Sequence, residues 1–318
     1  MIIRMANMCR LRRFTRHVLA LCLAYSLSAC GLVELLRCAP HGEDMRFVGM
    51  VDTCMNNDDD GFRADSVVHR VYCFRGEGTK PPVLLLHELP GLSGKTLEYA
   101  RELSKEFTVY VPLLFGALNS QSTVSGSFAA LGLNGEWRGL ESGESDIVKW
   151  LRAVVTEIAR LHSGQPIGVI GNCLTGTLPL ALLDNPQIHA VVLAQPTLPM
   201  TVFRNDKDVK SSLGISAAEI ESAKQSSAKI FYVRFDQDCV SKPEKLQKVV
   251  DTFTGKEEEP NRVSVHVISE AKYPVKNAHS TLIGEWHCGE SGKASREVQD
   301  EVRRFLRAPE TFKPMSER

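Results

Sequence analysis

The sequence predicts an α/β fold with a mostly parallel central sheet and helices on both of its faces. Three observations support this prediction. Short, continuously apolar segments are typical of strands buried on both faces, and they recur along the chain. Segments with one apolar stripe at helical spacing alternate with them. A Gly-x-Cys-x-x-Gly sequence at residues 171–176 joins one apolar strand to an apolar segment of helical length.

Each element follows from its own pattern. Strands are predicted where apolar residues run without interruption, and helices where they form a stripe, as Ile147, Trp150, Leu151 and Val154 do. In chain order, the predicted strands are 67–74 at an edge, 82–86, 107–114, 167–170, 190–194, 229–235 and 263–268. The predicted helices are 96–106, 145–161, 174–183, one after the capping box 216–219, one opened by Pro243, and 295–307.

The composition fits one large globular domain preceded by a short N-terminal segment. The chain has 318 residues and is neutral, with 38 basic and 38 acidic residues. Five arginines and no acidic residue lie in residues 1–29, so the rest carries a net charge of about −5. No basic surface for nucleic acid is expected.

The first 29 residues are predicted to be a lipoprotein-type signal peptide. Arginines precede a short apolar run at 18–27, and small residues follow it. Residues 27–31 resemble a bacterial lipobox, in which Cys30 would carry the lipid. The alternatives are an ordinary cut after Ala29 or a start placed too early in the gene. The expected layout is a signal at 1–29, a tether at 30–61, the domain at 62–312 and a tail at 313–318. The protein is expected to be exported and membrane-anchored, facing the periplasm or the cell exterior.

Cysteine usage agrees with an oxidising compartment. Beyond Cys30, six cysteines remain, and some of them are expected to form disulfides. Sequence cannot fix the pairing, but Cys38 with Cys54 is the first expectation and Cys239 with Cys288 the second. No spacing typical of a structural metal site is present, and the acidic run at 58–60 is interpreted as a solvated turn instead of a calcium loop. No cofactor is expected.

The sequence at 171–176 predicts a nucleophile elbow, a sharp turn that raises one side chain at the end of a sheet. The raised residue is Cys173. At a helix N-terminus, its thiolate form would be favoured by the helix dipole. The alternative is a buried structural cysteine in a strand–helix junction.

A cysteine nucleophile needs a base and a residue that orients the base. His279 follows the last predicted strand by a loop, whereas His87 at another strand end is the rival base. His266 lies within a strand and is expected to be structural. For the acid, Asp238 is preferred to Asp236 because it lies deeper in the loop after strand 229–235. The order nucleophile, acid, base is that of α/β-hydrolases.

With these residues in place, the chain over 62–307 resembles the dienelactone hydrolase family of α/β-hydrolases. The resemblance rests on the segments 86–92, 171–176, 234–238 and 277–280. It implies that Glu88 contacts the resting thiol and helps to generate the thiolate when substrate binds. It also implies an oxyanion hole formed by the backbone N–H groups of Leu89 and Leu174, as expected for an elbow. The family's substrate-binding arginines have no confident match; Arg138 and Arg234 are the candidates.

The sequence therefore predicts a hydrolase of carboxylic esters or lactones that acts through Cys173, Asp238 and His279 and a covalent thioester. Two alternatives stay open: an inactive binding lipoprotein on a hydrolase fold, and an acyltransferase. The expected partner is a small-molecule ester or lactone. The segment 116–135, rich in Ser and Gly, is either a loop over the pocket or a plain surface loop. Neither the individual substrate nor the oligomeric state follows from the sequence.

Overall fold

The central sheet has eight strands and is mostly parallel. In the computed structural model, neighbouring strands follow the order β1-β4-β6-β5-β7-β8-β9-β10. The pairs β1–β4 and β4–β6 are antiparallel, and the other neighbouring pairs are parallel. The strands are β1 (Asp52–Thr53), β4 (Val71–Phe74), β5 (Pro82–Leu86), β6 (Thr108–Pro112), β7 (Ile167–Asn172), β8 (Ile188–Ala194), β9 (Lys229–Phe235) and β10 (Val263–Ile268).

The structure describes residues 52–75, 79–89, 91–116, 118, 135–199, 207–254, 262–274, 278–283 and 290–315. The predicted signal peptide, the lipidation of Cys30 and most of the predicted tether lie outside these residues. Most of the segment 116–135 also lies outside them. These expectations therefore stay predictions.

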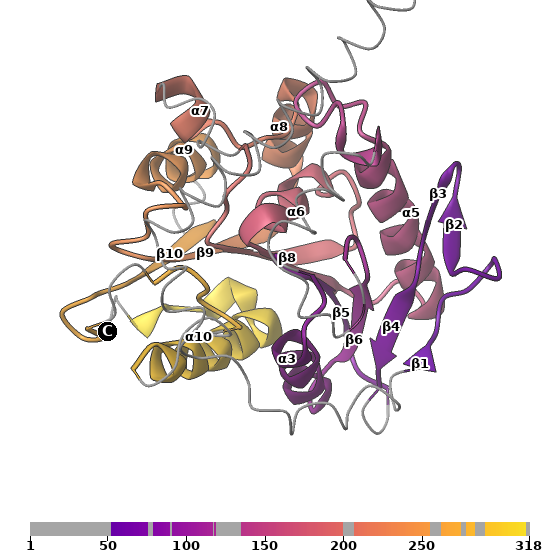
Figure 1. Ribbon diagram of the computed structural model, residues 1–318, viewed down its shortest axis with the longest axis horizontal. Coiled ribbons are helices and arrows are strands. Elements are labelled where there is room, and N and C mark those ends of the chain that lie inside the picture. The colour runs from indigo at the N-terminus through magenta and orange to yellow at the C-terminus, as the bar shows by residue number, and fades with distance from the viewer. Residues whose placement is uncertain are drawn as a thin grey trace, which may run out of the picture.

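Helices cover both faces of the sheet (Figure 1). On one face lie α3 (Gly94–Ser104) and α10 (Glu290–Arg307), whose apolar residues share a core with the sheet. On the other face, a second core is built with α5 (Asp146–Leu161), α6 (Leu178–Ala181), α8 (Ala217–Gln225) and α9 (Pro243–Phe253). The five-residue helix α7 (Lys207–Ser211) contacts α9. In the described parts of the chain, no helix has the length and apolar character needed to cross a membrane.

The two cores follow from the period-two geometry of the strands. In β9, Ile230 and Tyr232 belong to one core, whereas Phe231, Val233 and Phe235 belong to the other. Strand β8 divides its apolar residues in the same way. Successive side chains on a strand point to opposite faces, so a continuously apolar strand packs against the helices on both faces of the sheet. This arrangement confirms the predicted fold class.

The N-terminal end of the domain differs from the prediction. Residues 52–61 were expected in a tether, yet β1 pairs with β4 and extends the sheet. The predicted edge strand 67–74 is divided in two: β3 (Val67–His69) pairs with β2 (Phe62–Ala64) in a separate hairpin, and only β4 joins the main sheet. Strands of two or three residues are too short to show a hydrophobic period. The predicted C-terminal tail also begins inside the packed domain, because Pro314 is buried and the Met315 N–H donates to Glu301.

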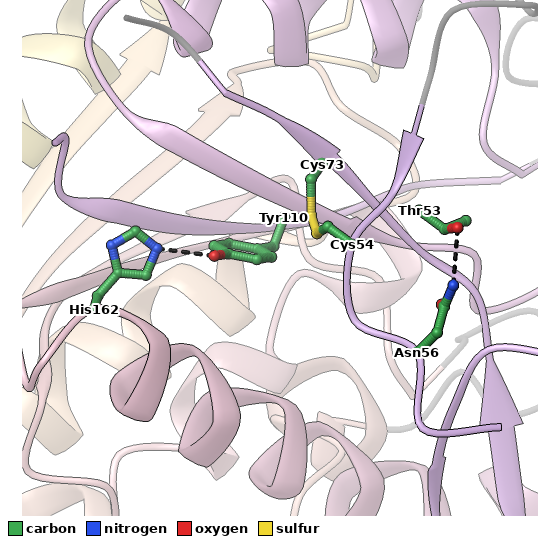
Figure 2. The surroundings of a disulfide bond; sticks show 6 residues. All are labelled: Thr53, Cys54, Asn56, Cys73, Tyr110 and His162. Carbon is green, nitrogen blue, oxygen red and sulfur yellow. Dashed lines mark hydrogen bonds between the residues drawn. A yellow bond between two sulfur atoms is a disulfide. The ribbon is translucent and has the colours of Figure 1, made fainter. Parts of the chain in front are cut away.

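A disulfide joins the two strands at this edge. Cys54 follows β1 and is bonded to Cys73 in β4, with their Cα atoms 5.8 Å apart (Figure 2). The expected pairing of Cys38 with Cys54 is therefore wrong; β1–β4 pairing brings Cys73 to Cys54 instead. The bond closes a loop with a sequence separation of 19 residues, for which the chain-entropy model gives about 3 kcal/mol of stabilisation. Cys239 is also disulfide-bonded, and Cys288, its expected partner, lies outside the described residues.

Candidate active site

Cys173 has the geometry of a nucleophile elbow. It follows β7 directly and has a φ of +50°, a left-handed conformation that is uncommon for a residue with a side chain. A Cβ at Gly171 would lie 2.4 Å from the Thr175 carbonyl oxygen, and one at Gly176 would lie 2.6 Å from the Pro196 Cα. Both glycines are therefore required by close backbone approach, which explains the spacing seen in the sequence.

Side chains of the elbow fix it to the end of the neighbouring strand β5. The Asn172 amide donates to the Leu86 carbonyl at 2.9 Å. The Thr175 hydroxyl accepts from the Asn172 N–H at 3.0 Å and lies 3.3 Å from the carbonyl oxygens of Leu86 and His87. All four residues are fully buried. The elbow thus has a fixed position relative to the β5 end, from which Glu88 and Leu89 emerge.

The helix predicted at 174–183 is interrupted. Cys173–Thr175 forms a 3₁₀ turn (η3), and α6 begins only at Leu178 and has four residues. Leu178–Pro179 at its start explains the break, because proline cannot continue a helix from the preceding residues. The helix after the thiol is therefore shorter than predicted, and the Cys173 side chain interacts with His279.

His279 lies between Asp238 and Cys173. Its Nδ1 is 2.8 Å from Oδ2 of Asp238, whose side chain is fully buried. Burial by itself would lower the pKa of His279, but the negative charges of Asp238 and Cys173 outweigh it. Together with the hydrogen bond to Asp238 and the interaction with the Cys173 side chain, they raise the pKa of His279 well above its usual value. The imidazolium form of this ring is therefore favoured.

The loop after β9 holds Asp238 in position. Its Oδ1 accepts from the N–H groups of Val240 and Ser241, at 2.8 and 2.9 Å, which leaves Oδ2 for His279. Asp236, the rival acid, instead accepts from the Glu270 N–H and ties this loop to the end of β10. The structure therefore brings Asp238, and not Asp236, to the histidine.

Arg234 does not lie where a substrate-binding residue was expected. Its buried guanidinium donates to the backbone carbonyls of Asp236, Asp238 and Ser241, at 2.8 to 3.4 Å. It thus braces the loop that carries Asp238. The side chain of Arg138, the other candidate, is exposed in the turn after the 3₁₀ helix η2 (Gly135–Trp137).

Glu88 also differs from the role implied by the resemblance. One carboxylate oxygen accepts from the Ser280 hydroxyl at 2.7 Å, and the other accepts from the Gln195 amide at 3.0 Å. Burial is the main cause that raises the pKa of Glu88, and the hydrogen bonds from Ser280 and Gln195 oppose it. The carboxylate therefore contacts the residue after His279, and among the hydrogen bonds of the described residues neither of its oxygens is paired with the Cys173 thiol.

Thr197 is a site residue that the sequence pattern did not single out. Its hydroxyl lies 3.7 Å from the Cys173 sulfur, and its N–H donates to the Cys173 carbonyl at 3.0 Å. It lies in the loop after β8, beyond the carboxyl end of a strand next to β7. That position is the only sequence signal, since ligand sites of such sheets gather there.

Leu89 and Leu174, the expected oxyanion donors, flank this site. Leu174 follows Cys173 in the elbow, and Leu89 follows Glu88 after β5. Among the hydrogen bonds of the described residues, neither backbone N–H donates to another protein group. Their role as an oxyanion hole stays a prediction.

A pocket of about 390 Å³ lies beside the loop that carries Thr197. It is lined by Trp137, Gly139, Leu140, Glu141, Ser142, Leu198, Pro199 and Gly214. Lys245 supports its wall, because its buried ammonium donates to the Leu198 carbonyl at 2.8 Å and to the Ser212 carbonyl at 2.5 Å. Burial lowers the pKa of Lys245 to about 8.

Within the described residues, no cluster of three or more metal-ligating side chains is present.

His87, the rival base, is committed to the backbone. Its Nε2 accepts from the Leu114 N–H at 3.0 Å, so its Nδ1 carries the proton and donates to the Glu88 carbonyl at 3.1 Å. Burial lowers the pKa of His87 to about 4. The ring is therefore neutral in the folded protein near pH 7 and orders the backbone around Glu88.

This shift predicts an acid-sensitive contribution to stability. The unfolded chain binds a proton at His87 below about pH 6.5, whereas the folded protein does so only near pH 4. The free energy of unfolding should therefore fall by up to about 3 kcal/mol as the pH decreases through this range. Urea unfolding at several pH values should show a smaller loss in His87→Gln than in the parent. If the free energy of unfolding depends on pH in the same way in both proteins, a neutral His87 in the folded state is contradicted. Subtracting one pH dependence from the other cancels the contributions of other acidic groups, Glu88 included.

Comparisons with known proteins agree with the fold. No family model matches the sequence, and no curated protein matches it either. Among solved structures, a candidate dienelactone hydrolase from Klebsiella pneumoniae has a TM-score of 0.52 at 16% identity, over 72% of this chain and 90% of that one. A dienelactone hydrolase-like promiscuous phosphotriesterase from metagenomic libraries has a TM-score of 0.53 at 16% identity, over 75% and 92%.

An acylaminoacyl peptidase from Pyrococcus horikoshii has a TM-score of 0.52 at 16% identity, and the match covers 80% of this chain but 41% of that one. At such identities the likeness shows the fold alone. The chain has the α/β-hydrolase fold, and in fold it is similar to dienelactone hydrolase-like proteins. The fold expected from the sequence is therefore confirmed, while the activity is a separate question.

Proposed function

We propose that the protein hydrolyses carboxylic esters or lactones, with Cys173 as the nucleophile. One observation carries this proposal: His279 is hydrogen-bonded to Asp238 on one side and interacts with the Cys173 side chain on the other, beyond the carboxyl ends of a parallel sheet. A nucleophile, a base and a residue that orients the base are what covalent acyl transfer requires. The hydrolase neighbours support the same reaction class.

The proposed reaction has two steps. The Cys173 thiolate attacks the carbonyl carbon, and the oxyanion that forms is stabilised by the N–H groups of Leu89 and Leu174. The carbon–oxygen bond then breaks, the His279 imidazolium protonates the leaving alcohol, and a thioester remains on the sulfur. In the second step, the neutral His279 takes a proton from water, the hydroxide attacks the thioester, and the carboxylic acid leaves with Cys173 restored.

The pocket beside Thr197 supports a small-molecule substrate with an apolar group. Its volume is within the range usual for small-ligand sites. Trp137, Leu140, Leu198 and Pro199 provide the apolar part of its lining. Leu198 is the residue after Thr197, so its Cα is within about 4 Å of the Thr197 Cα. We propose that this pocket receives the acyl or alkyl group of the ester.

Export and lipidation remain part of the proposal. The Cys54–Cys73 disulfide favours an oxidising compartment, where such bonds persist. The N-terminal sequence favours a lipid anchor on Cys30. Intact-mass analysis of the protein from a bacterial membrane fraction should find a diacylated Cys30 at the N-terminus. A mature chain that begins at Cys30 but carries no lipid would support export and contradict the lipid anchor.

Trapping the thioester tests the central claim. Rapid mixing with an activated acetyl ester should give a burst of the alcohol product equal to the enzyme concentration. Mass spectrometry of the quenched protein should find one added acetyl group, located on the peptide that contains Cys173. Acetylation of another residue, with turnover unchanged, would remove Cys173 from the mechanism. Binding without any burst would instead favour the inactive binding protein.

A substrate panel separates the remaining alternatives. We expect kcat/KM to be highest for an ester or a lactone, compared with a phosphotriester and an acylaminoacyl peptide. These two comparison substrates are taken from the names of structural neighbours. Adding an alcohol or amine acceptor distinguishes hydrolysis from acyl transfer, because a transferase would form the new ester or amide in place of the free acid.

A further inference from the structure

Four buried polar side chains form a continuous hydrogen-bonded cluster next to His279. None of them belongs to the triad of Cys173, Asp238 and His279. Glu88 follows β5, Gln195 follows β8, and Ser280 and Thr281 follow His279 in its loop. Each is at most 2% exposed. Polar groups buried to this degree need hydrogen-bond partners, and here they find them in one another.

The contacts connect two strand ends to the histidine loop. Glu88 accepts from the Ser280 hydroxyl at 2.7 Å and from the Gln195 amide at 3.0 Å. The other end of the Gln195 side chain accepts from the Thr281 N–H at 3.2 Å and from the Thr281 hydroxyl. The two residues directly after His279 are thus bound to the same pair of side chains.

Gln195 carries a second, independent sign of a constrained position. Its φ is +36°, in the region that residues with a side chain rarely adopt. Its N–H donates to the Val233 carbonyl at 2.7 Å, which ties this conformation to β9. Such backbone outliers persist where the surrounding structure imposes them, and they gather at functional sites.

We propose that Glu88 and Gln195 are positioning residues that hold the His279 loop by hydrogen bonds, so that the imidazole meets the Cys173 sulfur. The inference rests on the proposed function of the site. It replaces the thiol-activating charge implied for Glu88 with an uncharged requirement, namely hydrogen-bond partners for the Ser280 hydroxyl and the Gln195 amide. A shift of the ring by about 1 Å is enough to lower catalysis by roughly 10²-fold.

The comparison of Glu88→Gln with Glu88→Ala separates these two roles. A glutamine oxygen can accept from the Gln195 amide while its NH₂ group donates to the Ser280 hydroxyl, so the cluster survives without the charge. We expect Glu88→Gln to keep kcat for ester hydrolysis within about threefold of the parent. Glu88→Ala and Gln195→Ala should each lower kcat by roughly 10²-fold, with KM little changed. A loss in Glu88→Gln equal to that in Glu88→Ala would overturn the proposal, because glutamine keeps a hydrogen-bond partner for both Ser280 and Gln195 and lacks the charge.

The alkylation rate of Cys173 by iodoacetamide gives a readout that needs no substrate. Cys173 is the only free cysteine among the described residues, and peptide mapping isolates its signal. The pH dependence of alkylation should be the same in the parent and in Glu88→Gln, because the thiolate–imidazolium pair is intact. In Glu88→Ala, alkylation near neutral pH should slow by about tenfold. If no ester is hydrolysed but this pattern holds, the proposed function fails while the positioning role stands; equal alkylation in all variants contradicts the positioning role.

Glu219 provides a matched control for the loss of a buried carboxylate. It is 6% exposed, accepts from the Ser216 N–H and hydroxyl at 2.9 Å, and lies in α8. Glu219→Ala should lower Tm about as much as Glu88→Ala, since both leave buried donors without partners. It should leave kcat and the alkylation profile unchanged.

Thr281→Val, which removes one hydroxyl at equal volume, gives a milder variant should Glu88→Ala fail to fold. Its expected loss in kcat is about tenfold.

Discussion

Cys173→Ala should lower kcat for ester hydrolysis by about 10⁴-fold or more, to the level left by binding and the oxyanion donors alone. The reason is that, among the described residues, no second thiol can replace the sulfur: Cys54, Cys73 and Cys239 are disulfide-bonded. Steady-state kinetics with an activated ester at neutral pH measures the change, and the burst of acylation should disappear with it. Retained turnover at more than about a tenth of the parent rate would exclude the thioester route.

The same variant should fold normally. Cys173 is 8% exposed, and alanine removes one atom from a site bordered by Thr197 and His279. Its φ of +50° remains a cost, since alanine keeps the Cβ. Cys173→Gly removes that cost and should match or exceed the alanine variant in Tm, while it is equally inactive. Equal inactivity with a normal melting transition shows that the lost rate is chemical and does not come from unfolding.

The sheet was predictable because its strands are buried on both faces. In β5, β9 and β10, the predicted and the observed strands have the same bounds. Strand β5 is buried along its whole length and β9 at every residue but Lys229, whereas β10, at the sheet edge, is buried only at Ile268. The hairpin β2–β3 and the two-residue β1 lack that signal, because their pairing depends on distant parts of the chain. The pairing of Cys54 with Cys73 has the same origin: strand order decides it, and local sequence does not.

The site was predictable to the extent that chain order constrains it. Cys173, Asp238 and His279 each follow a parallel strand, and parallel strands end at one edge of the sheet. Neither residue type nor the family resemblance indicated the contacts that Arg234 and Glu88 make. Arg234 was expected to bind a substrate anion and Glu88 to supply a negative charge near the thiol. Both side chains instead form hydrogen bonds to groups in neighbouring loops. No local pattern marks Gln195, whose role depends on a backbone conformation and two loops that meet only in the folded chain.

Asp238→Asn should lower kcat/KM by about 10³- to 10⁴-fold, although it changes a single atom. The Val240 and Ser241 N–H groups require an oxygen at the Oδ1 position, so the new NH₂ group must face Nδ1 of His279. That nitrogen would then have to accept, which moves the ring proton to Nε2. A ring in this tautomer cannot take a proton from the substrate water or from the thiol.

The pH profile distinguishes this tautomer effect from a general loss of structure. In the parent, the raised pKa of His279 keeps the imidazolium, the proposed general acid, to a pH well above 6.5. Without the Asp238 charge, burial lowers that pKa, so the alkaline fall in kcat/KM should move to lower pH. Asp236→Asn is the matched control, because Asp236 is in the same loop but binds the Glu270 N–H, which an amide oxygen can still accept. We expect that control to stay within about twofold of the parent. An unchanged alkaline limb in Asp238→Asn would mean that His279 does not act as the acid.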